Sequence, residues 1–124
     1  SIPILDGQIL PIIEIHPNGF LYDYDSKYVE GGSKHVVPAK LPDEIFQACL
    51  DYAVKAHQVL GCRSISRTDF RWDDTLGISG LILLETNTQP GMTPTSLSPE
   101  QAAAVGISFS DLCSFLVEDA SCSR

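Results

Sequence analysis

The stretch from Leu83 to Leu97 constrains this chain more than any other. It begins as an apolar run, presents Glu85 and Asn87, and then breaks into a loop that contains Gly91 and several hydroxyl groups. Because side chains alternate between the two faces of a strand, Glu85 and Asn87 share one face. The stretch therefore predicts a buried strand that delivers two oxygen donors to one spot, followed by a binding loop.

Length and charge narrow the class of protein. At 124 residues and 44% hydrophobic content, the chain suits one domain with a modest core. Its net charge of -8 excludes nucleic acid and anionic membranes as general partners, because both need clustered Lys and Arg. No apolar run approaches the roughly 20 residues that span a bilayer, and the N-terminus Ser1-Ile2-Pro3 lacks the basic and apolar regions of a signal peptide, so we expect a cytoplasmic protein. Since the chain opens inside an apolar run without Met, we also expect it to be a piece of a longer protein.

Apolar periodicity predicts an α+β fold with a largely antiparallel sheet and packed helices. Asp6-Gly7 between two Ile-rich runs is typical of a hairpin, and Pro3 and Pro11 favour edge or bulge positions for its strands. Residues 20–32, rich in Tyr, Asp and Gly, predict either a lid or binding loop, or a surface loop whose tyrosines pack down. The predicted regular elements are strands at 1–5, 9–15, 63–72 and 81–87, and helices at 42–60, 99–105 and 109–119.

Cysteine and histidine spacing gives no metal or redox motif. The four cysteines form no C-x-x-C pair, and Cys49 and Cys113 fall on apolar helix faces, so free buried thiols are favoured over a zinc site or a disulfide. His57 stands alone in its predicted helix, which indicates a packing or surface role rather than catalysis.

Two predicted strands bring charged groups together. Strands joined by a short connection usually pair antiparallel, and one register places Arg67, Asp69, Glu85 and Asn87 on a common face. Carboxylate and amide oxygens suit Mg²⁺ or Mn²⁺ rather than zinc. The competing interpretation is a structural ion pair between Arg67 and one of the carboxylates.

The loop after the second strand offers backbone and hydroxyl groups. A glycine at position 91 lets the backbone approach a ligand closely, and N–H groups there are able to hold a developing oxyanion. The hydroxyls of Thr95 and Ser96, ahead of a helix, would instead receive a carboxylate. Ser98, followed by Pro99 and by Gln three residues later, predicts the helix N-cap.

Four motifs along almost the whole chain, in order, closely resemble the C-terminal part of the D-alanine:D-alanine ligases of the ATP-grasp superfamily. The resemblance implies that residues 1–124 form the C-terminal portion of an ATP-grasp ligase domain whose N-terminal and central domains are absent. The motifs are Tyr22-Asp23-Tyr24-Asp25-Ser26-Lys27-Tyr28, Leu60-Gly61-Cys62-Arg63, Arg67-Thr68-Asp69-Phe70 and Leu84-Glu85-Thr86-Asn87-Thr88-Gln89-Pro90-Gly91-Met92-Thr93.

By this resemblance, Asp69, Glu85 and Asn87 would bind two Mg²⁺ or Mn²⁺ ions on the phosphates of ATP. Arg67 and the Gly91 amide would stabilise the tetrahedral intermediate. The implied chemistry joins two D-alanines through an acyl phosphate, for peptidoglycan precursor synthesis, in a full-length enzyme that forms a homodimer.

The acceptor side of the site is implied in the same way. Lys27, Ser96 and Leu97 would bind the carboxylate of the second D-alanine, and Tyr28 would belong to the loop that closes the site. Two departures from the family are Pro94-Thr95, where Ser-His is usual, and a long connection between residues 72 and 81.

Three functions remain open at this point. The first is the D-alanine:D-alanine ligase, of which this chain would be an inactive part when isolated. The second is a sister ligase that uses D-lactate or D-serine, although Tyr28 favours the dipeptide. The third is a noncatalytic Mg²⁺-binding or interaction domain, which would need the acidic groups but not Arg67 or the Gly91 loop.

Overall fold

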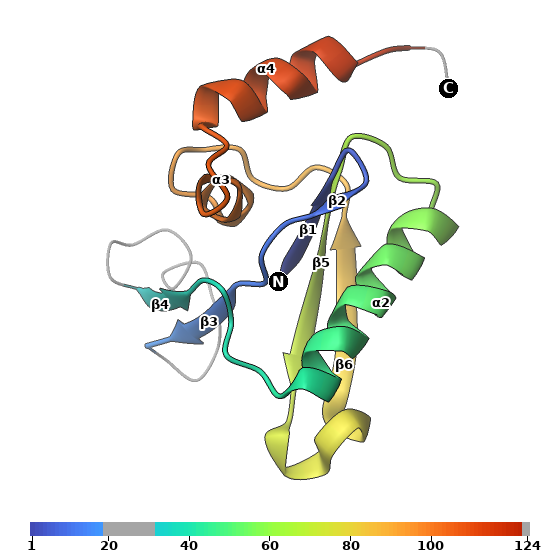
Figure 1. Cartoon of the computed structure of the whole chain (residues 1–124), viewed down its shortest axis with the longest axis vertical. Helices are drawn as coiled ribbons and strands as arrows, with labels where there is room; N and C mark the ends of the chain where they lie inside the picture. The colour runs from blue at the N-terminus through green and yellow to red at the C-terminus, as the bar shows by residue number, and fades with distance from the viewer. Residues whose placement is uncertain (19–31, 123–124) are drawn as a thin grey trace.

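The computed structural model describes residues 1–18 and 32–122. A four-stranded antiparallel sheet has the order β2-β1-β5-β6, and β3 pairs with β4 in a separate two-stranded sheet (Figure 1). This arrangement confirms the α+β prediction. The elements are β1 (Ile2–Leu5), β2 (Gln8–Ile9), β3 (Glu14–Pro17), β4 (Ser33–Val36), α2 (Asp43–Val59), β5 (Ile65–Trp72), the 3-10 segment η1 (Asp74–Gly80), β6 (Leu81–Asn87), α3 (Leu97–Ala103) and α4 (Phe109–Asp119).

The predicted hairpin forms, but its strands differ from the prediction. Asp6 and Gly7 take φ values of 48° and 73°, as a two-residue turn between twisted strands requires. The second strand stops at Ile9, because Pro11 has no N–H to continue the ladder. The edge position predicted for Pro3 is wrong, since β1 lies between β2 and β5. Pro3 is tolerated there because its carbonyl faces Leu10, whose N–H lies 2.9 Å away, so its missing N–H falls on the side where β2 is short.

Helix α2 covers one face of the four-stranded sheet (Figure 1). Ile45, Cys49 and Ala53, each four residues apart, bury against the strands. Ile2 and Ile4 of β1 belong to the same core, and all four cysteines are free. The helix has Pro42 at its N-cap and Leu60 at its C-cap, close to the predicted ends. This face of the sheet is therefore closed by apolar packing.

Helices α3 and α4 pack on the opposite face at the end of the sheet near the β1–β2 turn (Figure 1). Leu5 and Ile65, which pair across β1 and β5, join Leu10, Ala102 and Leu112 in a second core. The helix predicted at 109–119 is confirmed; its Leu112 is buried and its Val117 is exposed. Because the two helices cover only this end, Arg67 and Asp69 further along β5 are left to line a cavity.

Helix α3 starts two residues earlier than its sequence pattern predicts. Ser96, not Ser98, is the N-cap, and Ser98 lies inside the helix with its side chain fully buried. A proline is tolerated anywhere in the first turn, where N–H groups lack helical partners, so Pro99 fits both registers. Burial of Leu97 and Ala102 in the core selects the earlier start.

Strand β6 is an edge strand, which corrects the prediction that it is buried. Ile82, Leu83 and Leu84 are 54%, 40% and 61% exposed. The apolar run does form a strand, but β6 has a neighbour, β5, on one side only. None of the helices in the described residues is long and apolar enough to cross a membrane.

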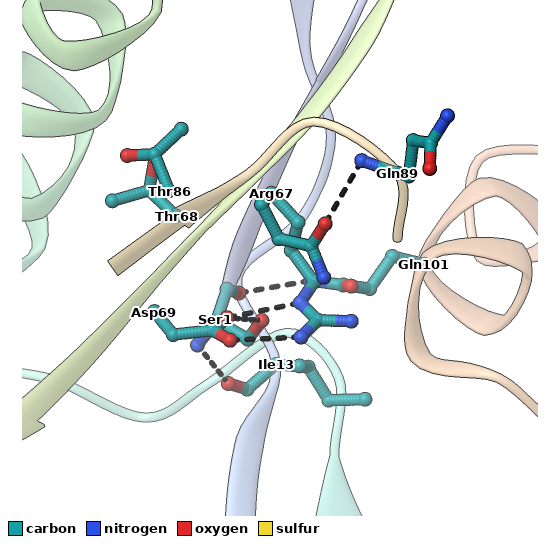
Figure 2. A network of polar contacts seen from close by, with 9 residues as sticks. Ser1, Ile13, Arg67, Thr68, Asp69, Thr86, Gln89 and Gln101 are labelled. Carbon is teal, nitrogen blue, oxygen red and sulfur yellow. Dashed lines mark hydrogen bonds and ion pairs between the residues drawn. The ribbon is translucent and has the colours of Figure 1, made fainter. Parts of the chain in front are cut away.

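Gln101 of α3 contacts the N-terminal segment of the chain. This side chain is fully buried. Its Nε2 donates to the Ser1 carbonyl at 2.9 Å (Figure 2) and to the Pro11 carbonyl at 2.8 Å. Its Oε1 and the Ser98 hydroxyl are buried without a partner among the described residues. Gln101 thus fixes α3 to β1 and to the segment that leads to β3.

We expect Gln101→Ala to destabilise the fold by about 2–3 kcal/mol, because it removes two buried hydrogen bonds and leaves the Pro11 carbonyl without its donor. Urea unfolding of the chain measures the change. Gln47→Ala, which removes an exposed glutamine of α2 that donates to Asp51, is the matched control and should stay within about 0.5 kcal/mol of the parent. Equal effects of the two substitutions would contradict the structural role of Gln101.

Candidate active site

A cavity of 770 Å³ extends along β5 and β6 and reaches Ile45 and Cys49 of α2. Strands β5 and β6, the loop after β6 and the start of α3 all contribute to its wall. Every predicted site residue within the described part of the chain lines it. These residues are Arg67, Asp69, Glu85, Asn87, Gly91, Ser96 and Leu97.

The register of β5 and β6 brings the four polar side chains together. Arg67 pairs with Asn87, and Asp69 pairs with Glu85. Directly opposed residues of an antiparallel pair share a face, so the prediction of one common face is confirmed. The register then shifts by one residue, which leaves Leu84 as a bulge in the cavity wall beside Glu85.

Arg67 and Asp69 form a bidentate ion pair. Arg67 Nε and Nη2 donate to Asp69 Oδ1 at 3.0 Å and Oδ2 at 2.8 Å, and the Ser1 hydroxyl donates to Oδ1 (Figure 2). Burial opposes ionisation of Asp69, but the hydrogen bonds from Arg67 and Ser1 and the charge of Arg67 outweigh it, so the pKa of Asp69 lies below its ordinary value. The structure therefore contains the Arg67–Asp69 ion pair, which the sequence offered as the alternative to a metal site.

The carboxylates nevertheless fit a hard divalent cation. Glu85 has no hydrogen-bond or ion-pair partner among the described residues and lies directly across from Asp69. Asn87 Oδ1 accepts from the Gln89 N–H at 2.8 Å, a contact that fixes the carboxamide and leaves a second lone pair. In the described ranges no three His, Cys, Asp or Glu side chains form a metal cluster. The donor set is thus two carboxylates and one amide, which suits Mg²⁺ that keeps water or phosphate ligands.

The loop after β6 is closed by hydroxyl contacts. Ser96 Oγ accepts from the Thr93 N–H at 3.1 Å and lies 2.7 Å from Thr93 Oγ1. A Cβ on Gly91 would lie 3.0 Å from Ser96 Oγ. The backbone at Gly91 therefore packs closely against Ser96, and a larger residue would require the Ser96 side chain to move.

Lys27, Tyr28 and the two histidines His57 and His35 have different outcomes. Lys27 and Tyr28, with nearly all of the predicted lid, lie outside the described residues. His57, as predicted, has a packing role: its Nδ1 lies 2.7 Å from the Ser66 hydroxyl, and burial lowers its pKa. Sequence reasoning missed His35, which lines the cavity and contacts α3. No local pattern in the sequence pointed to it, because its partner is 65 positions away.

A glycine loop beside a polar sheet face, on an antiparallel sheet backed by helices, is the arrangement of the C-terminal part of ATP-grasp ligases. A sequence model described as "D-ala D-ala ligase C-terminus" matches residues 1–118, and the chain belongs to this family.

Similar proteins agree with this assignment. The chain is 61% identical over 124 residues to the D-alanine--D-alanine ligase of Ruegeria sp. strain TM1040, and 61% identical to that of Ruegeria pomeroyi. All of this chain is aligned in both cases, and it spans 40% of the length of these relatives.

Solved structures give the same result for the fold. The D-alanine--D-alanine ligase from Bacillus anthracis complexed with ATP matches with a TM-score of 0.73 at 32% identity. A second structure of that ligase gives a TM-score of 0.72 at 33% identity. Each match covers 94% of this chain and 37% of the other chain.

We expect Asp69 to make the free energy of unfolding depend on pH in the acidic range. Because its folded pKa lies below the ordinary value of 3.8, its ionised form stabilises the fold above pH 3.8, and this stability is lost as the pH falls from there through the lowered pKa. Urea unfolding at a series of acidic pH values should give a flatter profile for Asp69→Asn than for the parent chain. The same substitution at Asp51, an exposed carboxylate of α2, is the control and should keep the parent slope; a parent slope in Asp69→Asn would contradict the assignment.

Proposed function

We propose that the full-length protein is an ATP-dependent D-alanine:D-alanine ligase and that this chain supplies one wall of its active site. The observation that carries the proposal is the convergence of seven predicted site residues on one cavity in a chain of this family. A domain that only bound a cation would need the carboxylates, but it would not need Arg67 and the Gly91 loop in the same cavity.

In the proposed reaction, one D-alanine carboxylate attacks the γ-phosphorus of ATP, which gives an acyl phosphate and ADP. The amine of a second D-alanine then attacks the acyl carbon and phosphate leaves, so one amide bond forms and one P–O bond of ATP is broken. Peptidoglycan precursor synthesis in the cytoplasm is the process that would use the product. The other proposed partners are the rest of the ligase chain and a second copy of the enzyme.

The chain's own residues have distinct proposed roles. Arg67 and the Gly91 N–H would face the oxyanion that develops as the amine attacks, where fixed donors lower the barrier. Ser96 and Leu97 would hold the carboxylate of the acceptor D-alanine, together with Lys27, and Tyr28 would close the site. Ser96 and Leu97 follow the loop that begins at the Asn87 end of β6 and line the cavity, which supports an acceptor site at that end.

Asp69, Glu85 and Asn87 would hold two Mg²⁺ or Mn²⁺ ions. Bound there, the ions would neutralise charge on the phosphates of ATP. Arg67 would have to share Asp69 with the metal, since it already occupies both carboxylate oxygens. Glu85, directly across the strand pair, is the carboxylate best placed to receive an ion without displacing Arg67.

The direct test is an assay of the full-length enzyme with ATP, Mg²⁺ and D-alanine. We expect phosphate release that depends on D-alanine, together with formation of the D-alanyl-D-alanine dipeptide. D-lactate and D-serine as second substrates should give much less product; preferential use of either would favour the sister ligase. Mg²⁺ binding without any nucleotide-dependent turnover would favour the noncatalytic domain.

We expect Arg67→Ala in the full-length enzyme to lower kcat about 100-fold or more, because one fixed donor to the oxyanion is typically worth about 3 kcal/mol. ATP binding should remain within a few-fold of the parent. Steady-state kinetics and nucleotide titration measure the two effects, and Arg63→Ala, at a distant turn where Arg63 contacts Ser121, is the control. Near-normal turnover of Arg67→Ala would exclude the proposed role.

We expect the isolated 124-residue chain to have no ligase activity, because the proposed reaction needs an ATP and D-alanine site of which the chain supplies one wall. Dipeptide formation is measured with the chain alone and with the full-length enzyme as the positive control. Dipeptide produced by the chain alone would contradict this division of the site.

A further inference from the structure

His35 is a cavity residue to which the proposed reaction assigns no role. It lies in the middle of β4, and its Nδ1 lies 2.7 Å from Glu100 Oε2 in α3. Its Nε2 lies 3.0 Å from the Ser33 hydroxyl. The side chains of His35 and Glu100 are 22% and 38% exposed, so the contact is partly shielded from water.

His35 belongs to the β3–β4 hairpin, whose backbone is hydrogen-bonded to the rest of the chain. The β3–β4 hairpin is joined to the core at both of its roots. On one side, Ile13 and Ser1 exchange backbone contacts at 3.0 Å and 2.9 Å. On the other side, the Ala39 N–H donates to the Ile12 carbonyl at 2.8 Å. His35 is therefore held in place whether or not it contacts the helix.

Glu100 lies in the first turn of α3, and the contact with His35 attaches this turn to the hairpin. The Glu100 N–H donates to the Ser96 carbonyl at 3.1 Å, so Glu100 lies one helical turn from Ser96. The Ser96 side chain makes no capping hydrogen bond, and it contacts Thr93 in the preceding loop instead. A contact between His35 and Glu100 thus supplies an attachment for the first turn of α3 that its N-cap side chain does not supply.

We propose that the His35–Glu100 contact positions Ser96 and Leu97 for the carboxylate of the acceptor D-alanine. The proposal rests on the proposed function and deepens it: His35 and Glu100 are positioning residues for the acceptor side of the cavity and do not touch the reacting atoms. Ser33, His35 and Glu100 have the hydrogen-bond order of a nucleophile, base and acid, but Ser33 does not belong to the cavity wall, so the positioning role accounts for more of the geometry.

The test uses the full-length enzyme and separates acceptor binding from ATP binding. We expect Glu100→Ala and His35→Ala each to raise the KM for the acceptor D-alanine about tenfold, with the KM for ATP within about twofold of the parent. The double variant should be no worse than either single variant, because both remove the same contact. Glu100→Gln, which keeps an oxygen acceptor, should restore most of the loss.

Lys34→Ala is the matched control, since Lys34 is an exposed neighbour of His35 on the same strand, and it should keep all parent kinetic values. Equal increases in both KM values, or additive effects in the double variant, would overturn the proposal. So would an unchanged acceptor KM in variants whose unfolding temperature is also unchanged.

Nitrogen chemical shifts of the His35 ring give a readout that does not need turnover. In the parent enzyme we expect the proton of the ring to be fixed on Nδ1. In Glu100→Ala we expect the proton no longer to be fixed on this nitrogen. If the ring shows this contact while the full-length enzyme makes no dipeptide, the proposed function fails and the contact stands. If the ring shows no fixed proton on Nδ1 in an active enzyme, the positioning role fails and the function stands.

Discussion

The antiparallel pairing of β5 with β6 is the constraint on which the rest of the cavity depends. With Arg67 opposite Asn87 and Asp69 opposite Glu85, all four polar side chains leave the same face of the sheet. A slip of one residue would turn β6's donors toward α2, where Cys49 and the other core residues would bury them. The opposite face is committed to apolar packing with α2, so the register is selected by the core and the polar face follows from it.

Attachment of the helices decides where that polar face ends. The core formed by Leu5, Ile65 and Leu112 draws α3 and α4 onto one end of the sheet, and Gln101 ties α3 to the backbone of Ser1 and Pro11. The loop that carries Gly91 must then run from the end of β6 to the start of α3. Its hydroxyl contacts and the close approach of Gly91 to Ser96 hold the loop in this connection, and Gly91 lines the same cavity as the polar side chains.

The extent to which sequence predicted this arrangement depends on the range of the interactions. The strand character of β5 and β6 and the bounds of α4 are local properties, and both were predicted correctly, although the bulge at Leu84 interrupts the alternation along β6. The buried position expected for Leu84 was wrong, because apolar composition cannot distinguish an edge strand from a central one. The cap expected at Ser98 was wrong because the helix start is decided by burial of Leu97. The contact of His35 with α3 left no local signal, since it depends on how the hairpin and the helix meet in space.

The charges of the site conflict with local stability. Asp69 and Glu85 are like charges in directly opposed positions, an arrangement that destabilises an antiparallel pair. Arg67 compensates Asp69 through two hydrogen bonds, but among the described residues nothing compensates Glu85. Glu85 is exposed, so water solvates its charge and limits the cost of the opposed pair. The exposed carboxylate lies beside a bidentate ion pair, a glycine loop and a bulged Leu84, and such departures from local rules concentrate where a protein binds or reacts.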